Sequence, residues 1–209
     1  GRPGNVVVLP NATHLLPLPD AALVKAKALP LRFLFVGRFA YNKGIGVLLE
    51  AARQLNQEGL AAAYELHLAG KGPLFEEMKA RHPLPNVQFW GFVSDADLDQ
   101  AYLQDHVFVL PTLFEGMPTV VLEAMARAMP ILVTDTGATL ELVDAKNGMI
   151  LPKNDVQGLK GAMRAMIEME GAAFEAMSAA SLDRVRERFT WEAVAKAHLG
   201  LFREMWHSL

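Results

Sequence analysis

The sequence predicts an α/β domain: a Rossmann-like parallel sheet of about six strands with helices on both faces. From Arg32 onward, short runs rich in Val, Leu, Ile and Phe alternate with longer segments of helical periodicity. This alternation is typical of a parallel sheet covered by helices. With 209 residues, 52% of them hydrophobic and 21% charged, the chain is long enough and apolar enough to bury a substantial core.

Six apolar runs are the predicted strands, at residues 32–37, 64–69, 87–89, 107–110, 131–133 and 149–151. The first crossover helix follows the first strand, because apolar residues recur there at helical spacing until Gly59 ends the pattern. These residues are Ile45, Leu48, Leu49, Ala52 and Leu55. Shorter helices are predicted at 73–81 and 95–101, the second with Ser94 as N-cap and Asp97 three residues later. Three helices close the chain, at 156–168, 174–187 and 191–207, the last behind Thr190 as cap.

Residues 1–30 are predicted to form an interdomain crossover segment and linker, and residues 31–209 the domain itself. The apolar run at 6–9 breaks at once into PNATHLLPLPD, which is rich in turn-forming residues. We therefore expect the chain to derive from a longer parent.

Composition excludes several classes of function. The chain carries 23 acidic and 20 basic residues, a net charge of −3, so it presents no broad cationic field for nucleic acid or an anionic membrane. It has no cysteine, which excludes a disulfide scaffold and a thiolate metal site and fits a reducing compartment. No stretch has the pattern of a membrane span or a signal peptide. The expected location is cytoplasmic.

Ligands of open α/β sheets bind beyond the carboxyl ends of the strands, where three loops of this sequence carry suitable groups. In the first loop Gly37 allows a tight turn, and Arg38 and Lys43 place two cations at the mouth of a helix, where they could grip a diphosphate. The alternative is a pair of solvated loop cations. The loop lacks the GxGxxG pattern, which argues against a nicotinamide-dependent dehydrogenase.

The second loop contains Gly70 and Gly72, which can let a planar group approach the backbone. Taken alone this signal is weak, because glycine and proline commonly punctuate such turns, and a structural role is the commoner reading. The same caution applies to Phe92 and Val93.

The third loop is the most informative. It turns through Glu115, Gly116, Met117 and Pro118 into a helix that begins near Thr119, whose first backbone N–H groups would attract an anion such as phosphate. Glu123 lies one turn further on, in an apolar helix that must be largely buried. A buried carboxylate needs partners, and ribose hydroxyls are suitable donors. The alternative for Glu123 is an i,i+4 ion pair with Arg127.

These residues resemble the GT-B-fold, retaining, sugar-nucleotide-dependent glycosyltransferases, a group that includes sucrose and glycogen synthases. The most specific element is F-E-G-x-P-x-x-x-x-E-A-M-A at residues 114–126, with two glutamates seven residues apart. Supporting elements are G-R-x-x-x-x-K-G at 37–44, G-x-G-P at 70–73 and N-V-x-F-x-G-F-V at 86–93. V-L-P-N at 8–11 is similar to the interdomain crossover, and the helix from Trp191 resembles the one that crosses back.

The resemblance implies that the chain is the C-terminal, donor-binding half of such an enzyme, with an upstream acceptor-binding domain in the same parent chain. Arg38 and Lys43 would then hold the donor diphosphate, Glu115 would contact the transferred sugar, and Glu123 would bind ribose. Backbone amides near the stretch from Met117 to Val120, as the loop enters the helix, would serve phosphate and sugar, with Gly116 and Pro118 shaping the turn. Phe92 and Val93 would flank the base. The donor would be a UDP-, GDP- or ADP-sugar, with no metal or cofactor in this domain and no nucleic acid partner. Peripheral membrane association would involve only the upstream domain.

Three positions depart from the family pattern, and each has alanine in place of glycine. Ala128 and Met129 displace the glycine before Pro130, Gly137-Ala138 replaces a Gly-Gly turn, and Asn11-Ala12 replaces Asn-Gly. A positive φ at Ala138 would crowd its methyl group and loosen that loop. Two other functions remain open: a non-catalytic nucleotide-binding module, and a nucleotide-sugar epimerase of the same fold.

Overall fold

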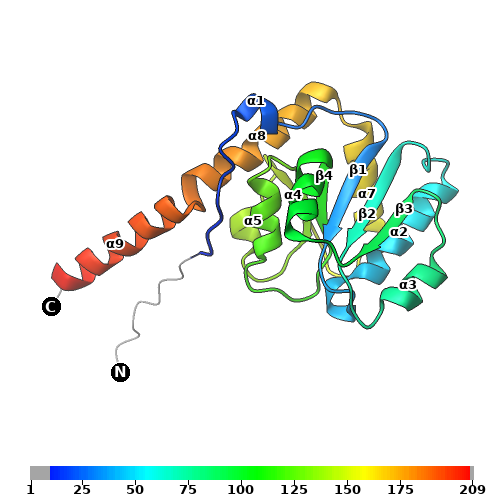
Figure 1. Ribbon diagram of the computed structural model, residues 1–209, viewed down its shortest axis with the longest axis horizontal. Coiled ribbons are helices and arrows are strands. Elements are labelled where there is room, and N and C mark those ends of the chain that lie inside the picture. The colour runs from blue at the N-terminus through cyan, green and yellow to red at the C-terminus, as the bar shows by residue number, and fades with distance from the viewer. Residues whose placement is uncertain (1–9, 208–209) are drawn as a thin grey trace.

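The computed structural model describes residues 10–207 and shows one parallel six-stranded sheet in the order β3-β2-β1-β4-β5-β6 (Figure 1). The strands are β1 (Leu31–Val36), β2 (Tyr64–Ala69), β3 (Val87–Gly91), β4 (Val107–Leu110), β5 (Ile131–Thr134) and β6 (Gly148–Leu151). The strand order reverses between β1 and β4, which is the position where doubly wound sheets open a crevice for ligands. The six predicted strands are confirmed, each to within two residues at either end.

Helices cover both faces of the sheet. They are α1 (Asp20–Leu23), α2 (Ile45–Gln57), α3 (Phe75–Arg81), α4 (Asp95–Gln104), α5 (Thr119–Met125), α6 (Thr139–Leu142), α7 (Val156–Glu168), α8 (Gly171–Arg188) and α9 (Trp191–His207), with a 3-10 turn η1 at Tyr41–Lys43. The helices α2 and α7 pack together on one face, and α5 packs against α8 on the other. Figure 1 shows α4 beside α5 on this second face.

The sequence pattern explains these elements. All five apolar residues of the predicted α2 face are buried, and Gly59, just beyond the helix, has a φ of +87° that favours glycine at a helix end. Every residue of β4 and β5 is buried, as expected for strands covered on both faces. The hydroxyl of Ser94 accepts from the backbone N–H of Asp97 at 3.2 Å, so the predicted N-cap of α4 is confirmed.

The predicted linker contains more structure than its composition indicates. Residues 1–9, including the apolar run at 6–9, lie outside the described residues. Further on, Thr13 donates its backbone N–H to the carbonyl of Phe189 at 2.8 Å and forms a bridge with Thr190. Leu23 is buried with Ala128 and Leu182 in a small cluster. This burial explains the short helix α1, which was not predicted because its neighbours in the sequence are turn-forming residues.

The helix α9 projects away from the rest of the domain (Figure 1). Several of its large apolar side chains are exposed, namely Trp191, Leu199, Phe202 and Trp206. Among the described residues, no helix is long and apolar enough to cross a membrane.

Candidate functional site

The three loops singled out in the sequence meet at the carboxyl edge of the sheet. Phe39, in the first loop, donates its backbone N–H to the carbonyl of Lys71 in the second loop, and its own carbonyl accepts from Leu74, both at 3.0 Å. The carbonyl of Asn42 accepts from the backbone N–H of Leu113 at 2.8 Å and from the hydroxyl of Thr112 at 2.9 Å. The first loop is thus tied to both of the others.

Glycines make these contacts between loops sterically feasible. A Cβ on Gly70, whose φ is +127°, would lie 2.0 Å from the carbonyl oxygen of Gly37, and a Cβ on Gly72 would lie 2.4 Å from that of Phe39. A Cβ on Gly44 would lie 1.9 Å from the carbonyl oxygen of Pro111. The close approach at Gly70 and Gly72 is therefore that of the first loop, which is a structural reason for both glycines.

The two predicted cations have different surroundings. The ammonium group of Lys43 forms an ion pair with the carboxylate of Glu115, and both side chains are mostly buried. Arg38 is exposed and, within residues 10–207, forms no ion pair or side-chain hydrogen bond. It lines a hollow of about 320 Å³ together with Gly37, Gly70, Phe92 and Val93. Arg38 is thus available to an anion, whereas Lys43 already neutralises Glu115.

The start of α5 lies beside this ion pair. Pro118 is its N-cap residue and provides no side-chain cap. Thr119 is exposed and Val120 half-buried, and within the described part of the chain no acceptor is seen for their backbone N–H groups. The carbonyl of Met117 accepts from the side-chain amide of Asn11 at 3.0 Å. An anion at this loop would find two backbone donors.

Glu123 is half-buried on α5, and its partner is a tyrosine that the sequence analysis did not identify. The hydroxyl of Tyr102 donates to Oε2 of Glu123 at 3.0 Å. The alternative ion pair with Arg127 is wrong. The guanidinium of Arg127 donates to the main-chain carbonyl of Glu123 at 3.3 Å and pairs with the carboxylate of Asp99, because α4 brings Asp99 within its reach.

Glu123 lines a groove of about 520 Å³ between α4 and α5. On the side of α5, the groove is lined by Thr119, Glu123 and Arg127. His14 and Trp191 also line its wall. Leu98 lines both this groove and the hollow of Arg38. Glu123 and Arg38 therefore line adjoining hollows that share Leu98.

The loop at residues 135–139 closes against Glu115. Gly137 has a φ of +51° and a Cβ on it would lie 2.1 Å from the carbonyl oxygen of Glu115, whereas Ala138 has an ordinary φ of −90°. The expected crowding at Ala138 is therefore absent, because the positive φ falls on the glycine that this sequence retains. At the other departure, Ala128 itself has a φ of +55°.

Comparisons with known proteins identify the family of this chain. Residues 30–169 match the model of the family described as glycosyl transferases group 1. One relative is the protein of Salmonella typhimurium named "Putative colanic acid biosynthesis glycosyltransferase WcaL". It is 31% identical over 183 residues, which are 82% of this chain and 44% of that protein. Sucrose-phosphate synthase from Thermosynechococcus elongatus is 26% identical with a TM-score of 0.77, over 96% of this chain and 53% of that one. Anabaena Alr3699/HepE, solved in complex with UDP, is 20% identical with a TM-score of 0.71, over 86% and 49%.

Sheet order defines a doubly wound, Rossmann-like domain whose strand order reverses between β1 and β4, the position at which such folds bind ligands. The chain belongs to the glycosyl transferases group 1 family. It spans about half the length of the curated relatives it matches. The predicted fold class, a Rossmann-like half of a GT-B fold, is confirmed.

Proposed function

We propose that this chain binds a nucleoside-diphosphate sugar and forms the donor side of a retaining glycosyl transfer to an acceptor hydroxyl. The observation that carries the proposal is the pair of adjoining hollows that share Leu98, one presenting the exposed cation Arg38 and the other the carboxylate of Glu123. A nucleotide needs both kinds of group: a cation for phosphate oxygens and an acceptor for ribose hydroxyls. The UDP bound to Alr3699/HepE supports this reading.

In this proposal the base lies against Phe92 and Val93 in the hollow of Arg38, and the ribose bridges to Glu123. Arg38 and the free amides at Thr119 and Val120 stabilise the leaving diphosphate as its charge develops. Lys43 contributes through the donors of its ammonium group that its pair with Glu115 does not use. Glu115 contacts the transferred sugar, and its ion pair with Lys43 fixes the carboxylate in place. Catalysis would rest on these fixed charges rather than on a metal. No cluster of three or more potential metal ligands occurs among the described residues.

The domain boundaries form part of the proposal. Residues 1–30 would be the crossover and linker, residues 31–209 the donor domain, and the acceptor site would lie on an upstream domain of the same chain. The contact of Thr13 with Phe189 supports a crossover here, because it places residues of the crossover segment beside the end of α8. Transfer needs both substrates in one geometry, so the isolated domain is expected to bind the donor without transferring sugar.

Calorimetry with UDP, GDP and ADP tests donor binding. We expect one of them to bind and Arg38→Ala to weaken that binding about 10- to 100-fold, the effect of losing a charge-assisted hydrogen bond. Arg203→Ala, which removes an exposed arginine on α9, is the matched control and should leave the affinity unchanged. The proposal fails if none of the three binds at millimolar concentration, or if Arg38→Ala binds as well as the wild type.

The alternatives give different results. A non-catalytic module would bind the nucleotide but gain no transfer activity when the full parent chain is supplied with donor and acceptor. An epimerase would convert a nucleotide sugar to its epimer without any acceptor, which NMR of the sugar ring protons would detect.

A further inference from the structure

We propose that Tyr102 is a positioning residue for donor binding, which holds one oxygen of the Glu123 carboxylate so that the other faces the ribose hydroxyls. This inference rests on the proposed function. Its starting observation is the hydrogen bond from the hydroxyl of Tyr102 to Oε2 of Glu123 at 3.0 Å. Tyr102 is 1% exposed, so water has little access to the phenol side of this bond.

The chemistry of the pair suits this role. An ionised carboxylate only accepts hydrogen bonds, and it can turn about its last side-chain bond. The phenol occupies one oxygen and fixes the plane of the group, which leaves Oε1 of Glu123 for a donor in the groove. Burial, together with the Glu123 carboxylate, raises the pKa of the Tyr102 hydroxyl well above its ordinary range, so the phenol stays protonated and remains a donor.

The ring of Tyr102 is itself held on two sides. It packs against Phe108 of β4 with ring centroids 6.1 Å apart, and the guanidinium of Arg127 lies over it at 5.6 Å from the centroid. Since Arg127 also pairs with Asp99 of α4 and bonds the main chain of Glu123, it clamps α4 to α5. The hydroxyl of Tyr102 therefore has little freedom to leave Glu123.

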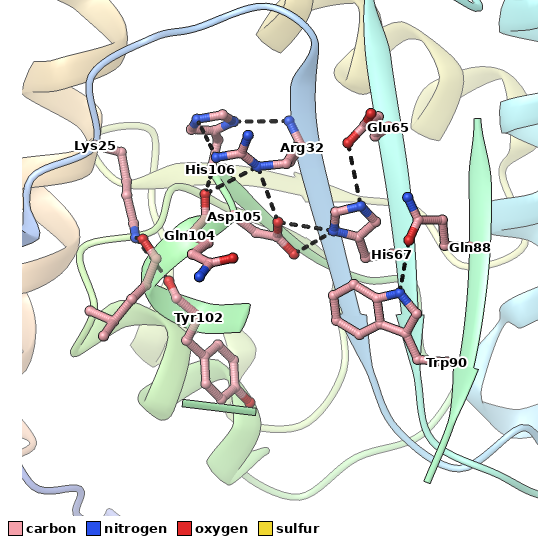
Figure 2. Close-up of polar contacts among 11 residues, drawn as sticks. Lys25, Arg32, Glu65, His67, Gln88, Trp90, Tyr102, Gln104, Asp105 and His106 are labelled. Carbon is pink, nitrogen blue, oxygen red and sulfur yellow. Dashed lines mark hydrogen bonds and ion pairs between the residues drawn. The ribbon is translucent and has the colours of Figure 1, made fainter. Parts of the chain in front are cut away.

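A buried network of charges anchors the end of α4 that carries Tyr102 (Figure 2). The ammonium group of Lys25 donates to the carbonyl oxygens of Tyr102 at 2.8 Å and Leu103 at 2.5 Å. Arg32 donates to the carbonyl oxygen of Gln104 at 3.2 Å. These bonds satisfy carbonyls in the last turn of α4 that have no partner within the helix. The main chain at Tyr102 is therefore held by Lys25 and Arg32.

Asp105 completes this anchor immediately after the helix. Its carboxylate lies 2.9 Å from Nδ1 of His67 on β2 and 3.4 Å from Nε of Arg32 on β1. The indole of Trp90 stacks on the ring of His67 at 4.6 Å between centroids, as Figure 2 shows. The end of α4 is thus attached to two strands, β1 and β2, and the position of the Tyr102 hydroxyl follows from the sheet rather than from a flexible loop.

A purely structural tyrosine would give the same contacts, so the test must isolate the ribose. Binding of UDP, GDP and ADP is measured beside their 2′,3′-dideoxy analogues, which lack the hydroxyls that Glu123 would accept. We expect Tyr102→Phe to weaken the bound ribonucleotide about 3- to 10-fold, the effect of one hydrogen bond, and to leave the dideoxy analogue unchanged. In a Glu123→Gln background Tyr102→Phe should have no further effect, because it acts through that carboxylate.

Tyr64→Phe is the matched control. Tyr64 is fully buried, and its hydroxyl donates to the carbonyl of Ala52 at 2.9 Å on the other face of the sheet, so this variant should lose stability without changing nucleotide preference. The inference is overturned if Tyr102→Phe leaves ribonucleotide affinity intact, or if it weakens both nucleotides equally. A wild type that binds a nucleotide without preferring ribose to dideoxyribose would remove the proposed role of Glu123, and this inference with it; failure of all nucleotides to bind would refute the proposed function itself.

Discussion

The contact of Gly137 with the Glu115 loop yields a quantitative prediction. In Gly137→Ala the new Cβ would lie 2.1 Å from the carbonyl oxygen of Glu115 and 2.4 Å from that of Gly116. Both atoms are backbone, so the loops must separate. The same change places alanine at a φ of +51°, a left-handed conformation that costs about 1 kcal/mol or more for a residue with a Cβ.

The expected destabilisation combines three terms. Left-handed strain of about 1 kcal/mol adds to about 1–3 kcal/mol for overpacking, and the stiffer unfolded chain returns about 0.4–1 kcal/mol. We therefore expect Gly137→Ala to lower the free energy of unfolding by roughly 2–3 kcal/mol. The displaced loop carries Glu115, so nucleotide-sugar affinity should fall as well.

Urea denaturation monitored by circular dichroism measures this difference. Gly116→Ala is the matched control, because a Cβ there has no atom within 4 Å and the residue has no positive φ, and it should change the free energy of unfolding by less than about 0.5 kcal/mol. If Gly137→Ala were as stable as Gly116→Ala, the close packing of the two loops would be refuted.

Two further predictions concern stability. Burial, with a smaller contribution from Arg32, lowers the pKa of His106 from 6.5 to about 4, so the unfolded chain binds a proton first and stability falls as the pH drops from 6.5 to 4. His106 is 6% exposed, and its titration should lower the free energy of unfolding by about 1–2 kcal/mol between pH 7 and pH 5. In His106→Asn the urea midpoint should depend less on pH over that range. An equal pH dependence of the midpoint in both proteins would contradict the prediction. Ser94→Ala removes the N-cap of α4 and should cost about 1 kcal/mol. Lys153→Ala, which changes an exposed side chain, is the control and should shift the free energy of unfolding by less than about 0.5 kcal/mol; a Ser94→Ala variant that melts with the wild type would show the cap to be dispensable.

Periodicity was sufficient to predict the strands and most helices, because each buries a continuous apolar face, as Leu48, Leu49 and Leu55 do in α2. Contacts between distant residues were not predictable in this way. The partner of Lys43 lies 72 residues away at Glu115, and no local spacing indicates that pair. Tyr102 lies in a helix with many polar residues, where a single tyrosine reads as an ordinary core residue.

Crowding at Ala138 was expected only if that residue had a positive φ, and the structure shows that it does not. Substitution of glycine by alanine indicates strain only when the position needs a positive φ, and that need belongs to the neighbouring Gly137. The anchor formed by Lys25, Asp105 and His67 was also missed, since its residues come from a predicted linker, the end of a helix and the middle of β2. Such sets are assembled by tertiary packing and leave no motif in the sequence.

The bridge between Thr13 and Thr190 has a mechanical consequence. Two segments meet there beside His14 and Trp191, whose rings lie 6.0 Å apart at the wall of the groove. The rod that starts at Trp191 has 17 residues, or roughly 25 Å at about 1.5 Å per residue. A swing of roughly 10° at Thr190 would therefore displace its tip by about 4 Å while shifting the indole at its base far less. Trp191, at the base of this rod, lines the same groove as Glu123, so a movement of the rod would alter the wall beside the expected ribose.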